Sequence, residues 1–276
     1  MSTARKTRGS SLFVDCGRVR LHVLEYGAGE RTLLLLPGIT SPAATWEFVA
    51  ERLAEDIRIL TWDARGRGLS DHPETGYGVG HFAADLDALL TALELDRPAV
   101  LAHSMGARIA AYFGARRPER VGPQIIVDPP MMGPGRPPYA SPMSAYIDEL
   151  RKASAGELTL EELGRSWPSW DIERLRDRQQ WLPTCSEAGV RESYLGLEQD
   201  DLASSWRGLR PPLLLIRSAD SPALSADDEA ELRAANPDAN YVSIAGAGHM
   251  VPYDNLEDFL GVVRRFLADS NGERKR

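Results

Sequence analysis

The sequence has few of the features that mark disulfide-rich, membrane-spanning or nucleic-acid-binding proteins. Its only two cysteines, Cys16 and Cys185, are far apart and show neither a disulfide framework nor metal-ligand spacing. No stretch approaches the roughly 18 consecutive apolar residues of a membrane span, and no long apolar segment opens the chain. The formal net charge is −8, without the basic stripe of a nucleic-acid-binding protein. We therefore expect a cytoplasmic protein, a monomer or homodimer, that binds neither nucleic acid nor a membrane.

Two glycine patterns typical of phosphate binding are also absent. The sequence contains no G-x-x-x-x-G-K-[ST] and no G-x-G-x-x-G after a strand pattern. What it does contain is 276 residues, of which 43% are hydrophobic, enough to bury the core of one large α/β domain.

Short apolar runs and amphipathic segments alternate along most of the chain, which predicts a largely parallel sheet with helices on both faces. The pattern stops after Pro129, and residues 131–206 are charged, helical in pattern and contain four of the six tryptophans. We interpret 131–206 as an inserted helical cap, and 1–130 with 207–276 as the body. The expected strands are 11–20, 21–26, 31–36, 57–62, 99–102, 124–128, 211–216 and 240–244; the expected helices include 46–55, 81–95, a helix opened by a capping box at Ser225, and 256–268.

Ser104 stands where an apolar strand pattern gives way to an Ala-rich helix pattern. The pentapeptide Ala102-His103-Ser104-Met105-Gly106 resembles the nucleophile elbow G-x-S-x-G, with alanine in place of the first glycine. Small residues are needed there because the strand and the helix pass close to the turn. The position predicts a nucleophilic serine.

A serine hydroxyl needs a base to remove its proton, and His249 is the candidate among five histidines. It ends the glycine-rich segment 245–249 that follows the last strand, at the sheet edge where ligands bind. We expect the side chain of His103 to point away from Ser104 along the strand, and to serve in packing or to support the catalytic residues. The remaining histidines lie in an early strand, a polar turn and a helix start: His22, His72 and His81.

Two carboxylates compete to orient the histidine. Asp128 and Asp220 each follow a strand and each lie between the serine and the histidine in sequence, so the chain order fits either. Spacing alone slightly favours Asp220, because the strand just before the histidine strand is the more common donor.

The oxyanion of an acyl-transfer reaction requires two backbone N–H donors. We assign one to Met105, directly after the serine, and the other to Ile39 in the loop after strand 31–36. Thr40 and Ser41 could add hydroxyl groups to the pocket or cap the following helix. The polar, glycine-rich segment 63–70 is interpreted as architectural, with Asp63 and Arg65 bonded to loop backbone or to each other.

These motifs resemble the α/β-hydrolase superfamily over residues 13–266. The fold that this resemblance implies is a mostly parallel eight-stranded sheet flanked by helices. A closer similarity, in segments 37–46, 103–108, 127–136 and 247–252, is to the N-formylmaleamate deformylases of nicotinate degradation and the related acetamidomethylene-succinate hydrolases. That subfamily takes its acid from a Val-Asp-Pro-Pro segment, which implies Asp128. The sequence departs from the deformylase pattern by also carrying Asp220 at the ordinary acid position.

The resemblance implies a serine hydrolase that cleaves an amide C–N bond in a small carboxylated substrate, without a metal or organic cofactor. Arg136 is the candidate carboxylate clamp, and aromatic residues could wall the pocket: Tyr139, Tyr146, Trp167 and Trp170. The same machinery serves carboxylesterases, lactonases and C–C bond hydrolases, and a small-ligand receptor built on a hydrolase body is the non-enzymatic alternative.

Overall fold

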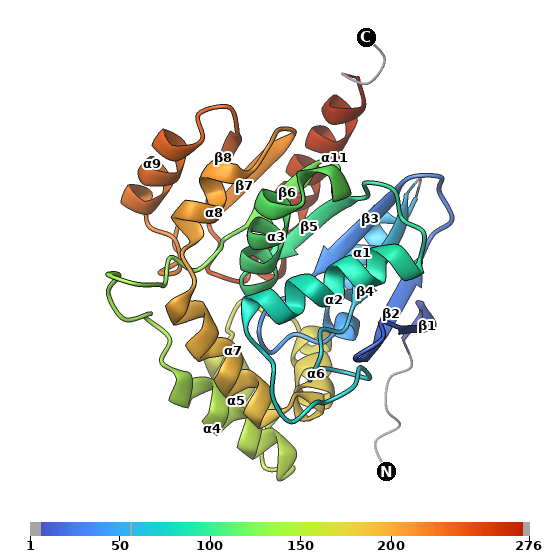
Figure 1. Ribbon diagram of the computed structural model, residues 1–276. Coiled ribbons are helices and arrows are strands. Elements are labelled where there is room, and N and C mark those ends of the chain that lie inside the picture. Colours follow the sequence, from blue (N-terminus) through green and yellow to red (C-terminus); the bar gives the residue numbers. More distant parts are fainter. Residues whose placement is uncertain (1–6, 56, 273–276) are drawn as a thin grey trace.

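A computed structural model describes residues 7–55 and 57–272 of the chain. Its centre is an eight-stranded sheet in the order β1-β2-β4-β3-β5-β6-β7-β8 (Figure 1). The pairs β1–β2 and β2–β4 are antiparallel, and all the other neighbours are parallel. The mostly parallel eight-stranded sheet expected from the sequence is therefore confirmed. The strands are β1 Ser10–Asp15, β2 Arg20–Tyr26, β3 Thr32–Leu36, β4 Arg58–Trp62, β5 Ala99–His103, β6 Gln124–Val127, β7 Leu213–Ser218 and β8 Asn240–Ile244.

The central strands are apolar on both faces because helices cover both. In β3, Leu34 and Leu36 point into one hydrophobic cluster, whereas Leu33 and Leu35 point into a second cluster on the opposite face. All four leucines are completely buried. This packing on both faces therefore fixes the position of the end of β3, where the loop after Leu36 begins.

Helices of the body lie on the two faces of the sheet. α1 (Glu47–Leu53) and α11 (Leu256–Gly272) pack together on one face. The other face is covered by α2 (Val79–Ala92), α3 (Met105–Arg116), α8 (Leu202–Gly208) and α9 (Ala226–Ala235). The capping box expected at Ser225 is confirmed, since its hydroxyl accepts from the N–H of Asp228 while that carboxylate accepts from the Ser225 N–H. A short α10 (Val251–Asp254) follows the loop after β8, and 3₁₀ turns occur at η1 Ala43–Trp46, η2 Pro118–Arg120 and η3 Leu182–Thr184.

The segment between β6 and β7 is helical, and four of its helices gather beside the carboxyl ends of the parallel strands (Figure 1). They are α4 Met143–Ser154, α5 Leu160–Ser166, α6 Ile172–Trp181 and α7 Glu187–Gln199. The fifth helix, α8, packs instead against α3 and α9 of the body. Trp206 is completely buried there and its indole N–H donates to the carbonyl of Leu232. The body packing thus begins before the boundary expected at residue 207, while residues 1–6 and 273–276 of the expected body lie outside the described residues.

Element ends differ from the expectations by a few residues. The first strand is shorter than 11–20 because Cys16 and Gly17 form the turn between β1 and β2. Helix α2 begins at Val79 rather than at residue 81 and ends at Ala92, where Glu94 has a positive φ. Within the part of the chain that the structure describes, no helix has both the length and the apolar character needed to cross a membrane.

Candidate active site

Ser104 occupies a sharp turn between β5 and α3. Its φ of 55° and ψ of −117° lie outside the regions that non-glycine residues normally adopt, as in a strained nucleophile elbow. A Cβ on Gly106 would lie 2.1 Å from the carbonyl oxygen of Leu36, so only glycine fits there. Ala102 is completely buried, and its methyl group is tolerated where the usual motif has its first glycine. The turn is therefore held by close backbone contact between β3 and the start of α3.

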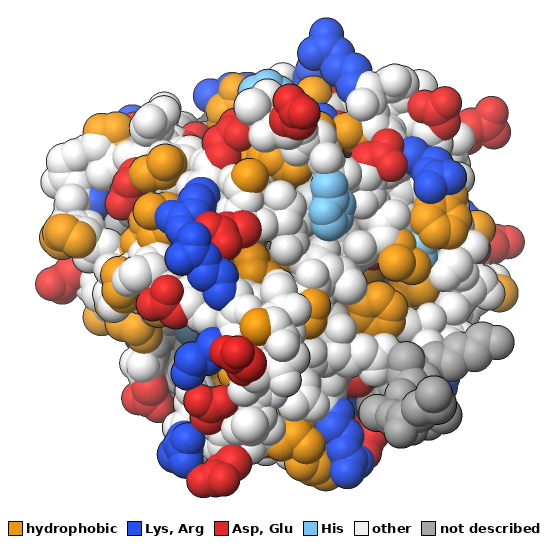
Figure 2. Space-filling model, turned by 90° about the horizontal axis from the view of Figure 1, so that it is seen from below, with side chains coloured by type: hydrophobic (Ala, Val, Ile, Leu, Met, Phe, Trp, Pro, Cys, Tyr) orange, Lys and Arg blue, Asp and Glu red, His pale blue; other side chains and the backbone are white. Residues whose placement is uncertain are grey.

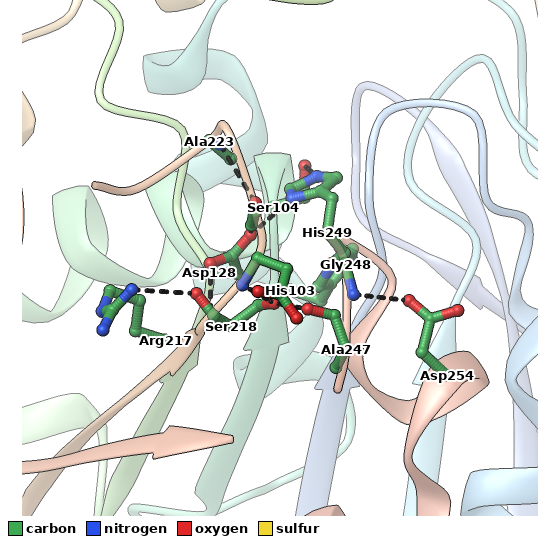
Figure 3. Close-up of polar contacts among 12 residues, drawn as sticks. His103, Ser104, Asp128, Arg217, Ser218, Ala223, Ala247, Gly248, His249 and Asp254 are labelled. Carbon is green, nitrogen blue, oxygen red and sulfur yellow. Dashed lines mark hydrogen bonds and ion pairs between the residues drawn. The ribbon is translucent and has the colours of Figure 1, made fainter. Parts of the chain in front are cut away.

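His249 lies in the loop between β8 and α10 and faces the serine (Figure 3). Its Nε2 is 2.9 Å from Ser104 Oγ. The loop is anchored next to the histidine, because the Gly248 N–H donates to the Asp254 carboxylate at 2.9 Å. The Asp254 side chain also accepts from the Ser169 hydroxyl, which lies between α5 and α6. The structure thus brings the predicted nucleophile and base into hydrogen-bond contact.

Asp128 follows β6 directly and is completely buried. Its Oδ2 is 2.7 Å from His249 Nδ1 and accepts from the Ser221 hydroxyl at 2.5 Å, while its Oδ1 accepts from the Ser218 N–H at 3.1 Å. A φ of 43° turns the residue out of the strand direction. This carboxylate is therefore aimed at the side of the imidazole that faces away from Ser104.

Asp220, the acid favoured by spacing, is exposed. Its backbone N–H donates to the Ala247 carbonyl at 3.3 Å, and its carboxylate makes no hydrogen bond with another described residue. The geometry therefore differs from the spacing preference. The reason is that the Asp128 side chain is buried and reaches His249 Nδ1, whereas the Asp220 side chain is exposed to solvent.

The loop after β3 forms a tight turn next to Ser104. The Ser41 N–H donates to the Gly38 carbonyl at 3.2 Å, and a Cβ on Gly38 would lie 3.3 Å from Ser104 Cβ. Among the described residues, the Ile39 N–H has no hydrogen-bond partner, and the N–H of Met105 belongs to the first turn of α3, where no helical acceptor exists. Both amides are thus available as donors beside the serine.

A cavity of about 250 Å³ opens onto the serine and histidine. Of the residues predicted to form the pocket, four line it: Thr40, Ser41, Tyr146 and Trp167. Ile39, the predicted oxyanion donor, lines it as well. The 3₁₀ turn η1 has Pro42 at its N-cap, so neither hydroxyl residue caps it. The other lining residues are Gly38, His103, Ser104, Ser141, Ala145, Glu149, Arg178, His249 and Met250.

Two of the predicted pocket aromatics lie behind the cavity wall. Trp170 is buried in a stack between Trp167 and Tyr253, with ring centroids 4.6 and 4.1 Å apart. Tyr139 is largely buried next to Tyr146, and burial raises its pKa. They support the residues that line the cavity but are not themselves among them.

Arg136 lies away from this cavity, which is a correction to its predicted role. Its guanidinium is paired with Glu231 and is 3.6 Å from Asp228, so two carboxylates already hold it on the surface between the helical insertion and α9. The arginine that lines the cavity is Arg178 of α6, which is 7% exposed. It forms a two-pronged ion pair with Glu149 of α4, in which Nε donates to Oε1 at 2.9 Å.

His103 does not point away from the site as expected. Its ring centroid is 4.8 Å from that of His249, and its Nε2–H donates to the His249 carbonyl at 2.8 Å. Burial, reinforced by repulsion from His249, lowers the pKa of His103 to about 3, so the ring is neutral. It therefore acts as a fixed donor that holds the backbone of the base.

Several residues of the site escape sequence reasoning. Ser218 and Ser221 support Asp128, and Glu149 with Arg178 forms the charged part of the wall. Ser218 is the last residue of β7 and Ser221 follows the strand, so both could have been found by the rule that places ligands at carboxyl strand ends. The Glu149–Arg178 pair joins two helices of the insertion, and no local signal marks it.

The surface around the insertion carries mixed charges. Figure 2 shows Lys and Arg side chains interspersed with Asp and Glu on the face viewed from below Figure 1. Ion pairs on the insertion follow this pattern, including Arg151–Glu187 and Arg165–Glu161. No extended basic patch is visible on this face.

The fold and the linked serine, histidine and aspartate define the class of protein. The chain belongs to the alpha/beta hydrolase family, whose model matches residues 33–262, and it is a hydrolase. It is 37% identical over 255 residues to the N-formylmaleamate deformylase of Pseudomonas putida KT2440, covering 92% of this chain and 95% of the relative. It is 29% identical to the 2-(acetamidomethylene)succinate hydrolase of Mesorhizobium japonicum, covering 92% of this chain and 94% of the relative. A crystal structure of a serine-to-alanine variant of the N-formylmaleamic acid deformylase from Pseudomonas putida S16 superposes with a TM-score of 0.86 at 37% identity, covering 93% of this chain and all of that one.

Proposed function

We propose that this hydrolase cleaves the formyl C–N bond of N-formylmaleamate or a closely similar small carboxylated amide, with Ser104 as nucleophile, His249 as base and Asp128 as the orienting acid. The observation that carries the proposal is the continuous hydrogen-bonded chain from Asp128 through His249 to Ser104, which opens into a cavity containing an arginine. The 37% identity to a deformylase over nearly the whole chain supports the choice of bond.

The first half of the reaction forms an ester on the serine. Nε2 of His249 takes the Ser104 proton as Oγ attacks the formyl carbon, and Asp128 stabilises the imidazolium through Nδ1–H. The imidazolium then donates its proton to the departing nitrogen, so that the C–N bond breaks and maleamate leaves. Water, deprotonated by the same histidine, hydrolyses the formyl ester, and formate leaves with the serine hydroxyl restored.

Backbone amides stabilise the charge that develops during both halves. The N–H groups of Ile39 and Met105 belong to a turn and a helix start next to the serine, both formed before the substrate arrives. Donors that need no rearrangement are the most effective stabilisers of an oxyanion.

Arg178 replaces Arg136 as the residue proposed to bind the substrate carboxylate. N-formylmaleamate carries one carboxylate, and among the described residues one arginine lines the cavity. Nε and Nη2 of Arg178 are occupied by Glu149, while Nη1 has no hydrogen-bond partner within the described residues. The free Nη1 can therefore donate to a substrate carboxylate while Nε and Nη2 remain paired with Glu149.

Product identification tests this proposal because N-formylmaleamate has two C–N bonds that can break. Cleavage at the formyl carbon yields formate and maleamate, whereas cleavage at the other carbonyl yields formamide and maleate. We expect proton NMR to detect only formate and maleamate with the wild type, and no turnover with Ser104→Ala. Formamide and maleate would refute the choice of bond, and turnover by Ser104→Ala would refute the nucleophile.

A further inference from the structure

Arg67 lies in the glycine-rich loop after β4, in the segment interpreted from the sequence as architectural. Its side chain is 1% exposed, and its guanidinium makes four hydrogen bonds. Nε donates to the Ile39 carbonyl at 3.0 Å and Nη1 to the Arg65 carbonyl at 3.1 Å. Nη2 donates to the Ser193 hydroxyl at 2.9 Å and to the Gly189 carbonyl at 3.4 Å. One buried side chain therefore contacts the loop beside the nucleophile and a helix of the insertion together.

All four acceptors of this guanidinium are neutral. Within the described residues Arg67 forms no ion pair, whereas the neighbouring Arg65 pairs with Asp85 and the buried Arg108 pairs with Asp200. Burial lowers the pKa of Arg67 to about 10, which still leaves it charged at neutral pH. Its guanidinium also lies over the rings of Tyr77 and Phe82, at 5.8 and 5.6 Å. Burying a cation without an anion costs free energy, so a purely architectural role would be met better by a neutral side chain.

The contact with Ile39 fixes the turn that carries the proposed oxyanion donor. In the 38–41 turn, the Gly38 carbonyl accepts from the Ser41 N–H, and the Ile39 carbonyl accepts from Arg67. With both carbonyls held, the peptide planes of the turn cannot rotate, and the Ile39 N–H stays unpaired among the described residues. The buried positive charge also lies against the loop on which negative charge develops in the reaction.

The contacts with α7 connect the same turn to the insertion. Ser193 also donates to the Gly189 carbonyl at 2.6 Å, so both acceptors belong to one hydrogen-bonded turn of α7. The Ser186 N–H donates to the Gly66 carbonyl at 2.8 Å, and the Glu192 carboxylate accepts from the Tyr77 N–H at 2.8 Å. The N-cap of α7 is thus bonded to Gly66, next to Arg67, and the middle of α7 is bonded to Tyr77, whose ring lies beside the guanidinium.

We propose that Arg67 is a positioning residue. By bonding both to α7 and to the Ile39 carbonyl, it holds the Ile39 N–H in the orientation that binds the oxyanion. This proposal rests on the proposed serine mechanism but not on the identity of the substrate. It adds a function to a position that the sequence pattern leaves as part of a structural loop, and it makes the oxyanion site dependent on the insertion.

The test uses p-nitrophenyl acetate as substrate and phenylboronic acid as inhibitor, since the boronate forms a tetrahedral adduct with a nucleophilic serine and places an oxygen among the oxyanion donors. For Arg67→Met we expect kcat/KM and boronate affinity to fall together by about 10–100-fold, less than or equal to the loss of a direct oxyanion donor. Arg67→Lys, which keeps the charge and one donor, should recover part of both values. If Arg67→Met does not fold, Arg67→Lys alone tests the proposal, through partial losses of kcat/KM and of boronate affinity.

Two further variants separate positioning from stability. Arg65→Met removes a buried arginine of the same loop that does not touch Ile39, so it should lower the melting temperature while leaving boronate affinity within about 3-fold of the wild type. Ser193→Ala should weaken boronate binding in the wild type and have no additional effect in Arg67→Met, as expected if it acts through Arg67. Unchanged boronate affinity in Arg67→Met, or equal losses in Arg65→Met and Arg67→Met, would overturn the proposal. Failure of the deformylase assignment would appear separately, because the ester reports the serine whatever its natural substrate.

Discussion

Replacing Asp128 with asparagine probes the residue on which sequence spacing and geometry differ. The substitution keeps the size of a side chain that has no solvent exposure but removes its charge. Three hydrogen bonds converge on this carboxylate, from His249, Ser218 and Ser221. An asparagine amide can still accept from the Ser218 N–H, so the fold around it should persist.

The effect on catalysis should be large because the imidazole changes its tautomer. The NH₂ group of the introduced asparagine would face Nδ1 of His249, which must then accept a hydrogen bond and carry its proton on Nε2. In that form Nε2 cannot take the proton of Ser104. The same change in other triads lowers kcat on the order of 10⁴-fold, which corresponds to about 5.5 kcal/mol in the activation free energy.

Asp220→Asn is the matched control, because it makes the same chemical change at the competing acid. The Asp220 carboxylate is exposed and has no hydrogen-bond partner among the described residues. We expect kcat to stay within about 3-fold of the wild type, as for surface substitutions remote from the reacting atoms. The assay is ester and imide hydrolysis at matched folded concentrations, checked by melting temperature. A larger loss in Asp220→Asn than in Asp128→Asn would refute the assignment.

Three other substitutions test separate parts of the site. In urea unfolding, His103→Gln should reduce by about 2 kcal/mol the stability that the protein loses between pH 7.5 and pH 5. The folded pKa of His103, about 3, lies below the unfolded value of 6.5, so only the unfolded state takes up the proton as the pH falls through this window. An identical pH dependence in both proteins would contradict this. The double variant Arg178→Met, Glu149→Gln leaves no unpaired carboxylate; it should raise KM for N-formylmaleamate by about 10–100-fold and barely change KM for a neutral ester. Arg136→Ala serves as the control. Equal KM changes for both substrates would exclude a carboxylate site. Gly106→Ala should destabilise the protein by about 1–3 kcal/mol in denaturant unfolding, because its Cβ would lie 2.1 Å from a β3 carbonyl oxygen; wild-type stability would show that the elbow is looser than the structure indicates.

The sheet and the location of the site could be predicted because each depends on short-range patterns. Apolar runs of about four to six residues with glycine-rich exits place strands and loops, and parallel strands bring their carboxyl ends to one edge. This is sufficient to bring Ser104, His249 and both candidate acids near one another. It is not sufficient to choose the acid, since which of the two carboxylates is buried against His249 is a tertiary property.

The residues that line the cavity could not be predicted in the same way. Arg136 and Arg178 are both arginines in the insertion, and the difference between them is set by which helix faces the cavity and which carboxylates are near. Arg67 lies in a segment that the sequence indicates as architectural, and the strand pattern predicts that the His103 side chain points away from Ser104. Their partners, the carbonyls of Ile39 and His249, are 28 and 146 residues away in sequence. Contacts of that kind carry no periodic signal.

The most direct test of the central claim compares kcat/KM for N-formylmaleamate with that for p-nitrophenyl acetate, in the wild type and in Ser104→Ala. We expect kcat/KM of about 10⁴ M⁻¹s⁻¹ or more on N-formylmaleamate, a lower value on the ester, and loss of both in the variant. Rapid ester cleavage that depends on Ser104, without release of formate, would retain the nucleophile and contradict hydrolysis of the C–N bond.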